Sequence, residues 1–289
     1  MQFKLTNTLG PYLALIVTGG LLSGCANAQS NSDDVIAKQR ASLEANTAGK
    51  GFGPQSPRDI SQVYGTNQRI FGKAPHRSQM ELCNIHFHKF AEHKGGEFTT
   101  YAGKGNGEGI NTGYQWNGRL SDAQMKPVDR QVCAAKGPGQ ALNVGDTVEV
   151  HWVHSSSEIE PGATLSACLD EDNMNPALRV EAQVIVLAND ENALGFSELA
   201  EVEEINGYDQ APNIPMNTGQ PVEYLGSTTG PKYNEQGSAI KVTWSVRPQV
   251  AVVDINSVAN WCDDNIFNEN YGHKVRNLVT NHKLLSPIR

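Results

Sequence analysis

Apolar and polar residues alternate in several short segments of the chain, and this pattern predicts a mainly β protein. The clearest strand candidates lie at residues 148–153, 184–187, 240–246 and 250–253. Helical periodicity is scarce and is confined to residues 34–46 and 191–205. Glycine and proline are spread between the strand candidates, as turns require. We therefore expect one mostly antiparallel β domain over residues 51–289.

A separate apolar stretch stands at the N-terminus. One cation, Lys4, precedes a mainly apolar run over residues 9–22, which is too short for a stable membrane span and is typical of a secretory signal. We expect the signal peptide to cover residues 1–24 and a polar tether to follow over residues 25–50. The mature protein is therefore expected to be exported.

The end of this signal, Leu22-Ser23-Gly24-Cys25, resembles the cleavage motif of bacterial lipoproteins. On this interpretation Cys25 becomes the lipidated first residue and anchors the protein on the periplasmic side of a membrane. A single lipid chain binds weakly, so stable anchoring would need several acyl chains. The alternative is ordinary cleavage after Ala26-Asn27-Ala28, which would leave a soluble periplasmic or secreted protein.

Charge and composition exclude several classes of protein. The chain holds 23 Lys and Arg residues against 31 Asp and Glu residues, a net charge of −8, whereas a nucleic-acid-binding protein needs a basic face. Hydrophobic residues make up 38% and charged residues 19%, which fits neither a disordered chain nor an integral membrane protein. No nucleic-acid partner is expected, and the oligomeric state is open.

Four cysteines are left when Cys25 is set aside. An even number of cysteines in an exported protein favours disulfides, and four cysteines allow three pairings. We expect the pairs Cys133–Cys168 and Cys83–Cys262. A metal site on these cysteines is the weaker hypothesis, because no two of them form a C-x-x-C pair.

Two strand candidates carry histidines at a spacing that suits metal binding. On the first, Asn84, His86 and His88 would share one face, because side chains two residues apart on a strand point the same way. On the second, Glu149 and His151 would share a face for the same reason. Three neutral imidazoles leave the fourth position of a zinc ion open, which is the layout of a catalytic site. Asn84 and Glu149 would accept the outer ring N–H groups of His86 and His151.

The sequence resembles the carbonic anhydrases of the α type and their δ-like relatives. The similar segments are, in chain order, Gln55–Ile60, Asn84–His88, Glu92-His93, Glu149–His154, Tyr224–Pro231 and Lys241–Trp244. Each segment alone is weak, and their order makes the resemblance specific. It implies a single catalytic domain on a large, largely antiparallel twisted β-sheet with a few short helices.

This resemblance also implies an activity, the zinc-dependent reversible hydration of carbon dioxide to bicarbonate and a proton. Zinc would be held by His86, His88 and His151. Thr228 would donate its proton to Glu92 and accept a hydrogen bond from zinc-bound hydroxide, which orients the hydroxide toward carbon dioxide. Carbon dioxide and bicarbonate would be the small-molecule partners.

Further roles follow from the same resemblance. Thr229 would line the bicarbonate site, and Val242 and Trp244 would form its apolar wall. The chain between Ile60 and Cys83, which usually carries a proton-shuttling histidine in this family, is short here. His76 is the nearest candidate for that role.

Two other functions compete with this interpretation. The spacing His86-x-His88-x-x-x-Glu92 also fits the first motif of cupin barrels, which bind iron or manganese. Position 80 is Met, however, where that motif has Gly, and the later cupin segment is missing. The second competitor is a non-catalytic zinc-binding lipoprotein of the carbonic anhydrase fold.

Overall fold

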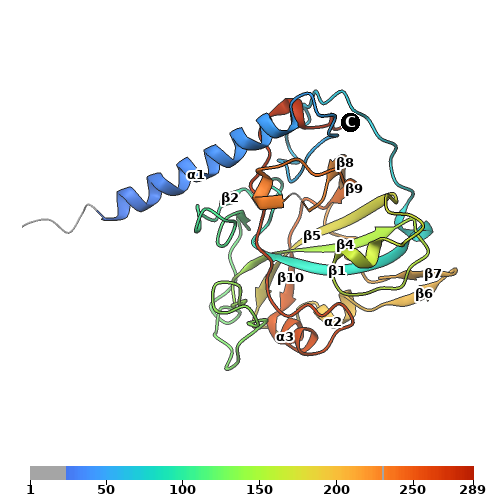
Figure 1. Ribbon diagram of the computed structural model, residues 1–289. Coiled ribbons are helices and arrows are strands. Elements are labelled where there is room, and N and C mark those ends of the chain that lie inside the picture. The colour runs from blue at the N-terminus through green and yellow to red at the C-terminus, as the bar shows by residue number, and fades with distance from the viewer. Residues whose placement is uncertain (1–23, 230) are drawn as a thin grey trace, which may run out of the picture.

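The computed structural model describes residues 24–229 and 231–289, and it is built on one twisted β-sheet (Figure 1). The predicted signal peptide, apart from its last residue Gly24, therefore lies outside the described residues. The main sheet consists of β1 (Glu81–Lys89), β4 (Thr147–Ser155), β5 (Leu178–Ala188), β8 (Val222–Ser227), β9 (Lys241–Val246) and β10 (Ala251–Asp254). Two small hairpin sheets accompany it: β2 (Thr100–Tyr101) with β3 (Tyr114–Gln115), and β6 (Glu203–Ile205) with β7 (Tyr208–Gln210).

The strand order of the main sheet is β1-β4-β5-β9-β8, and β10 also pairs with β5. The pairs β1–β4, β4–β5 and β8–β9 are antiparallel, whereas β9 and β10 each run parallel to β5. The prediction of a mostly β fold with a largely antiparallel sheet is confirmed, with these two parallel pairs as the exception. All four strand candidates overlap strands of this sheet.

Helices are few. The described ones are α1 (Gly24–Thr47), α2 (Phe196–Leu199) and α3 (Ile255–Asp263), with the 3₁₀ turns η1 (Arg77–Gln79), η2 (Leu165–Cys168), η3 (Pro231–Asn234) and η4 (His282–Leu284). Figure 1 shows α1 projecting from the body, and its later half packs on the domain through Ile36 and Leu43. None of the described helices is long and apolar enough to cross a membrane.

The expected helix at residues 191–205 is only the short α2, after which the chain turns into the β6–β7 hairpin. The turn is Asn206-Gly207, and both residues have positive φ angles, 56° and 82°. Asn-Gly is the preferred pair for a two-residue hairpin turn, because both of its positions need positive φ. This turn signal outweighs the helical periodicity that precedes it.

The sheet separates two apolar clusters. Phe87, Trp152 and Ile185 belong to the cluster that α3 covers, whereas Val153 and Trp244 belong to the cluster on the opposite face. Neighbours such as Trp152 and Val153 fall into different clusters because successive side chains of a strand point to opposite faces.

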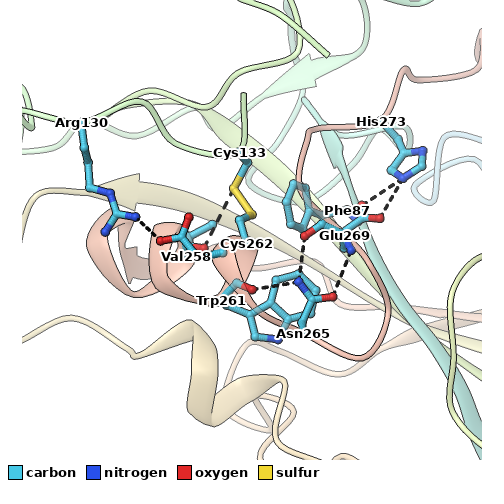
Figure 2. Close-up of a disulfide and its surroundings, with 10 residues drawn as sticks. Phe87, Arg130, Cys133, Val258, Trp261, Cys262, Asn265, Glu269 and His273 are labelled. Atoms are coloured by element: carbon cyan, nitrogen blue, oxygen red, sulfur yellow. Dashed lines mark hydrogen bonds and ion pairs between the residues drawn. A yellow bond between two sulfur atoms is a disulfide. The ribbon is translucent and has the colours of Figure 1, made fainter. Parts of the chain in front are cut away.

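The disulfides join Cys83 to Cys168 and Cys133 to Cys262, so the expected pairing is wrong. Cys83 lies on β1, and the loop that carries Cys168 folds back onto it, with the Gly162 N–H donating to the Cys83 carbonyl at 3.0 Å. Cys262 lies on α3 and faces the segment that carries Cys133 (Figure 2). Cysteine pairing depends on which chain segments meet, and the spacing of cysteines in the sequence does not contain that information.

Candidate metal centre

The register of two neighbouring strands brings the three predicted histidines together. β1 and β4 are antiparallel, and their register pairs His86 with His151 and His88 with Glu149. One ring nitrogen from each of the three histidines lies within 4.8 Å of the other two. The cluster therefore results from alternation within each strand and from the register between them.

A hydrogen bond on the outer side of each ring fixes the ring's tautomer. The bonds are from His86 Nδ1 to Asn84 Oδ1 (2.7 Å), from His88 Nδ1 to the Lys274 carbonyl (2.8 Å) and from His151 Nε2 to Glu149 Oε1 (2.9 Å). A carbonyl or carboxylate oxygen can only accept, so the ring nitrogen that faces it carries the proton. The Asn84 amide nitrogen donates to the Gly162 carbonyl, which leaves its oxygen for His86.

The other ring nitrogen of each histidine consequently carries a lone pair, and these lone pairs face one another. His151 Nδ1 and His86 Nε2 are 3.2 Å apart, and neither has a proton to donate to the other. Two facing lone pairs repel, whereas a divalent cation between them would satisfy both. With His88 Nε2, the cluster offers the three neutral nitrogen donors that zinc prefers. The residues present therefore fit a zinc ion.

Burial keeps two of these imidazoles neutral. Burial lowers the pKa of His86 well below its usual value, and the neighbouring His151 and His88 lower it further. Burial also lowers the pKa of His88, to about 4, although Glu92 opposes the shift. Neutral imidazoles are the form that binds a metal, so these rings need not lose a proton when a cation binds at neutral pH.

Glu149 is a buried carboxylate held by three hydrogen bonds. It accepts from His151 Nε2, from His93 Nδ1 at 2.5 Å and from the backbone N–H of His93 at 3.0 Å. Burial would raise the pKa of Glu149, but His93 and the hydrogen bonds from both rings hold it well below its usual range. His93 Nε2 accepts in turn from the Tyr224 hydroxyl at 2.7 Å. This chain of bonds fixes the orientation of His151.

A cavity of about 990 Å³ lies in front of the histidines. The three candidate ligands, Asn84, Glu92, Thr228 and Thr229 are among its lining residues. Its other walls come from the loop 163–166, the segment 267–274, and the side chains of Tyr233, Lys136 and Arg276. The two disulfides lie next to these walls, because Cys168 ends η2 and Cys262 precedes the second segment.

Thr228 and Glu92 both line this cavity, but the structure shows no hydrogen bond between these two described residues. Glu92 Oε1 instead accepts the backbone N–H of Arg276 at 2.9 Å and lies 3.5 Å from Arg276 Nε. Burial would raise the pKa of Glu92, but His88 and Arg276 lower it to about 2. The carboxylate is therefore ionised at neutral pH.

Three expected site residues are not brought to the cavity. Trp244 is buried with its ring 5.1 Å from that of His151, so it supports the ligand from behind. Val242, two residues earlier on β9, packs in the same apolar cluster. His76 caps η1, where its ring accepts from the Ser78 N–H, outside the lining of the cavity.

The segment 269–276 was missed by sequence reasoning, although it lines the cavity with His273, Lys274 and Arg276. It has no regular secondary structure and no alternating pattern. It acts partly through backbone groups, which any residue supplies. The cluster of basic side chains in His273-Lys274-Val275-Arg276 is the only signal that could have drawn attention to it.

Comparison with known families identifies the class of protein. A family model described as delta carbonic anhydrase matches residues 77–257, more than half of the chain, and the chain belongs to this family. The matched region contains all three candidate ligands, Glu92 and Thr228. A search of the curated proteins found no match.

Solved structures give distant matches. A hyperthermostable carbonic anhydrase from an active hydrothermal vent chimney is 14% identical, with 83% of this chain and 90% of that chain covered and a TM-score of 0.29. The Photobacterium profundum alpha-carbonic anhydrase is 14% identical, with 84% and 93% covered and a TM-score of 0.26. Dioscorin complexed with ascorbate is 15% identical, with 92% and 94% covered and a TM-score of 0.30.

Proposed function

We propose that this member of the delta carbonic anhydrase family catalyses the zinc-dependent reversible hydration of carbon dioxide to bicarbonate and a proton. The observation that carries the proposal is the convergence of three imidazole lone pairs on one point of a cavity. His86, His88 and His151 would hold the ion. When bound, zinc lowers the pKa of a coordinated water to about 7 and so supplies a nucleophile at neutral pH.

The outer hydrogen bonds keep the three ligands ready for the cation. Asn84, Glu149 and the Lys274 carbonyl each hold an imidazole in the tautomer whose lone pair faces inward. Such partners also raise the basicity of a ligand and restrict its rotation. The ligand set is therefore ordered before any ion binds.

Thr228 and Glu92 would orient the reacting oxygen. An ionised carboxylate can only accept, so a hydroxyl that donates to Glu92 must use its own lone pairs elsewhere. Thr228 is the hydroxyl that we propose for this task, because it lines the cavity that Glu92 also lines. Arg276 supports the role of Glu92 by holding one of its oxygens through the backbone N–H.

The walls of the cavity carry cations that suit the anionic product, bicarbonate. Thr229 is the residue that we propose to contact bicarbonate. Lys274 lies over the Tyr233 ring at 5.4 Å, and Lys136 lies over the Tyr271 ring at 5.6 Å. Both cations line the cavity of a chain whose net charge is −8. They would attract bicarbonate to a site that the rest of the protein repels.

The disulfides support a proposal on the compartment. Two disulfides are typical of a protein that folds in an oxidising environment outside the cytosol. We propose that the chain is exported and that Cys25 carries a lipid anchor. Mass spectrometry of the native protein tests this directly: an acylated N-terminal Cys25 supports the anchor, and an unmodified terminus after Ala28 contradicts it.

The ligand assignment is tested by two substitutions on the same strand. His151→Gln removes a proposed ligand, and His154→Gln changes a buried histidine on the opposite face of β4. The first variant should lose most of its zinc and nearly all hydration of carbon dioxide. The second should keep both, and it controls for the loss of a buried imidazole. Zinc content by mass spectrometry and stopped-flow hydration are the measurements.

Full zinc retention in His151→Gln would refute the assignment. A wild-type protein that binds one zinc ion and yet fails to hydrate carbon dioxide would instead favour a non-catalytic zinc-binding protein of the same fold. The specific observation in favour of that second function is that Glu92 contacts Arg276 and makes no bond to Thr228 among the described residues. The match to the delta carbonic anhydrase family argues against the cupin alternative.

A further inference from the structure

The ligand strand β1 lies at the edge of the main sheet, and among the residues that the structure describes its outer side has no full neighbouring strand. Phe87 stands between His86 and His88, and both of its backbone groups point to this outer side. The Phe87 carbonyl accepts from the His273 N–H at 2.9 Å. The Phe87 N–H donates to a side chain, the Glu269 carboxylate, at 3.2 Å. A buried carboxylate thus replaces the carbonyl that a neighbouring strand would supply.

Glu269 is itself held in place (Figure 2). The Asn265 side chain accepts the Glu269 N–H at 3.0 Å and donates to the carbonyls of Glu269 and Trp261, both at 2.8 Å. His273 Nε2 lies 3.0 Å from both Glu269 carboxylate oxygens. Trp261 belongs to α3, which the Cys133–Cys262 disulfide fixes to the rest of the domain. The carboxylate therefore reaches β1 from a turn anchored at both ends.

The burial of this carboxylate indicates a specific use. Glu269 is only 5% exposed, and burial of a carboxylate is unfavourable unless hydrogen bonds compensate for the lost water. Loss of the acceptor would leave the Phe87 N–H buried without a partner, which favours a shift of the strand backbone. Such a shift would move the two candidate ligands on either side of Phe87.

We propose that Glu269 is a positioning residue for the metal centre, which fixes the edge of β1 between two zinc ligands through the Phe87 N–H. This inference rests on the proposed zinc site and goes beyond it, because Glu269 is not one of the three nitrogen donors and acts on them through the backbone. The feature of Glu269 that matters is an acceptor oxygen whose side chain is long enough to meet the Phe87 N–H. Its charge is secondary.

Two substitutions of Glu269 separate the length of its side chain from its negative charge. Glu269→Gln keeps an acceptor oxygen at the same distance along the side chain and removes the charge. Glu269→Asp keeps the charge and shortens the side chain by one methylene. Glu181→Gln is the matched control, because Glu181 is an equally buried carboxylate on β5 that pairs with Arg179 away from the cavity.

Zinc release is the readout, measured on the full mature protein by transfer of zinc to an excess of a chromogenic chelator. We expect Glu269→Asp to release zinc about tenfold faster than wild type or more, because loss of a partner that orients metal ligands typically lowers metal affinity by about 10–100-fold. Glu269→Gln and Glu181→Gln should stay within about threefold of wild type. The visible spectrum of the cobalt-substituted protein, which reports ligand geometry, should change in Glu269→Asp alone.

Wild-type zinc release in Glu269→Asp would overturn the proposal, as would a larger effect in Glu269→Gln than in Glu269→Asp. If Glu269→Asp does not fold, Asn265→Asp removes the two donated bonds that anchor the turn. Faster zinc release in that variant supports the proposal, and unchanged release overturns it. Zinc release is measured without substrate, so an inactive protein that binds zinc would refute the proposed function and still test this inference.

Discussion

At the scale of single residues, the chemistry of the site is decided by the atoms that the metal would not touch. An imidazole has two nitrogens, and a fixed acceptor on one side leaves a lone pair on the other. Asn84, Glu149 and the Lys274 carbonyl make this choice for all three rings. These hydrogen bonds, together with the burial that keeps His86 and His88 neutral, prepare the site for a cation.

Removal of one hydroxyl tests the catalytic pair at this scale. Thr228→Ala should keep its zinc and lower the hydration rate by roughly a hundredfold, the effect of one orienting hydrogen bond of ~2.7 kcal/mol. Thr228→Ser, which keeps the hydroxyl, is the control and should stay within a few fold of wild type. Stopped-flow kinetics with zinc analysis measures both, and unchanged turnover in Thr228→Ala would remove this residue from the mechanism.

A pH dependence of the free energy of unfolding follows from His154, a buried histidine outside the candidate ligand set. Burial lowers the pKa of His154 to about 3, and Arg77 and Arg179 contribute to this shift. In the unfolded chain the His154 ring is protonated below about pH 6.5, whereas in the folded chain it is protonated only below about pH 3. The unfolded state therefore binds more protons in this window, and the free energy of unfolding falls as the pH falls.

The slope assigned to His154 is ~1.4 kcal/mol per pH unit. Wild type should show this slope and His154→Gln should lack it, so the difference in unfolding free energy between the two proteins carries the slope while the contribution of zinc cancels. Urea denaturation at a series of pH values between about 3.5 and 6.5 measures that difference. An identical pH slope in both proteins would show that His154 titrates normally in the fold.

At the scale of elements, alternation within each strand and the register between β1 and β4 place the candidate ligands. Alternation within residues 84–88 and 149–154 was readable from the sequence because the side-chain period of a strand is two. The register that sets His86 opposite His151 was not readable, since it depends on pairing between distant segments. The histidine ligands could thus be predicted, and their exact meeting point had to come from the structure.

The disulfide between Cys133 and Cys262 acts on the element scale, because it ties α3 to a loop 129 residues away in sequence. A crosslink over so long a loop restricts the unfolded chain strongly. The double variant Cys133→Ser, Cys262→Ser should therefore lose roughly 2–5 kcal/mol of unfolding free energy. Urea denaturation of the variant and of wild type measures the loss, and equal stability would show that this crosslink is dispensable.

At the scale of the whole molecule, the class of fold was predictable and the outer support of the site was not. Short alternating segments indicated one β domain, and these segments form strands of the main sheet. The segment 269–276 supports the site through the Lys274 carbonyl and the Arg276 N–H, which carry no sequence signature. The cysteine pairs and the place of His76 also depend on how distant segments meet.

The central claim is that one zinc ion held by three histidines makes this chain a carbonic anhydrase. The most direct test is a titration of the metal-free mature protein with zinc, with stopped-flow hydration of carbon dioxide measured at each step. We expect no activity without metal, then a linear rise in the hydration rate and a plateau at one zinc per chain. A folded, fully zinc-loaded protein with no hydration above the buffer rate would contradict this claim.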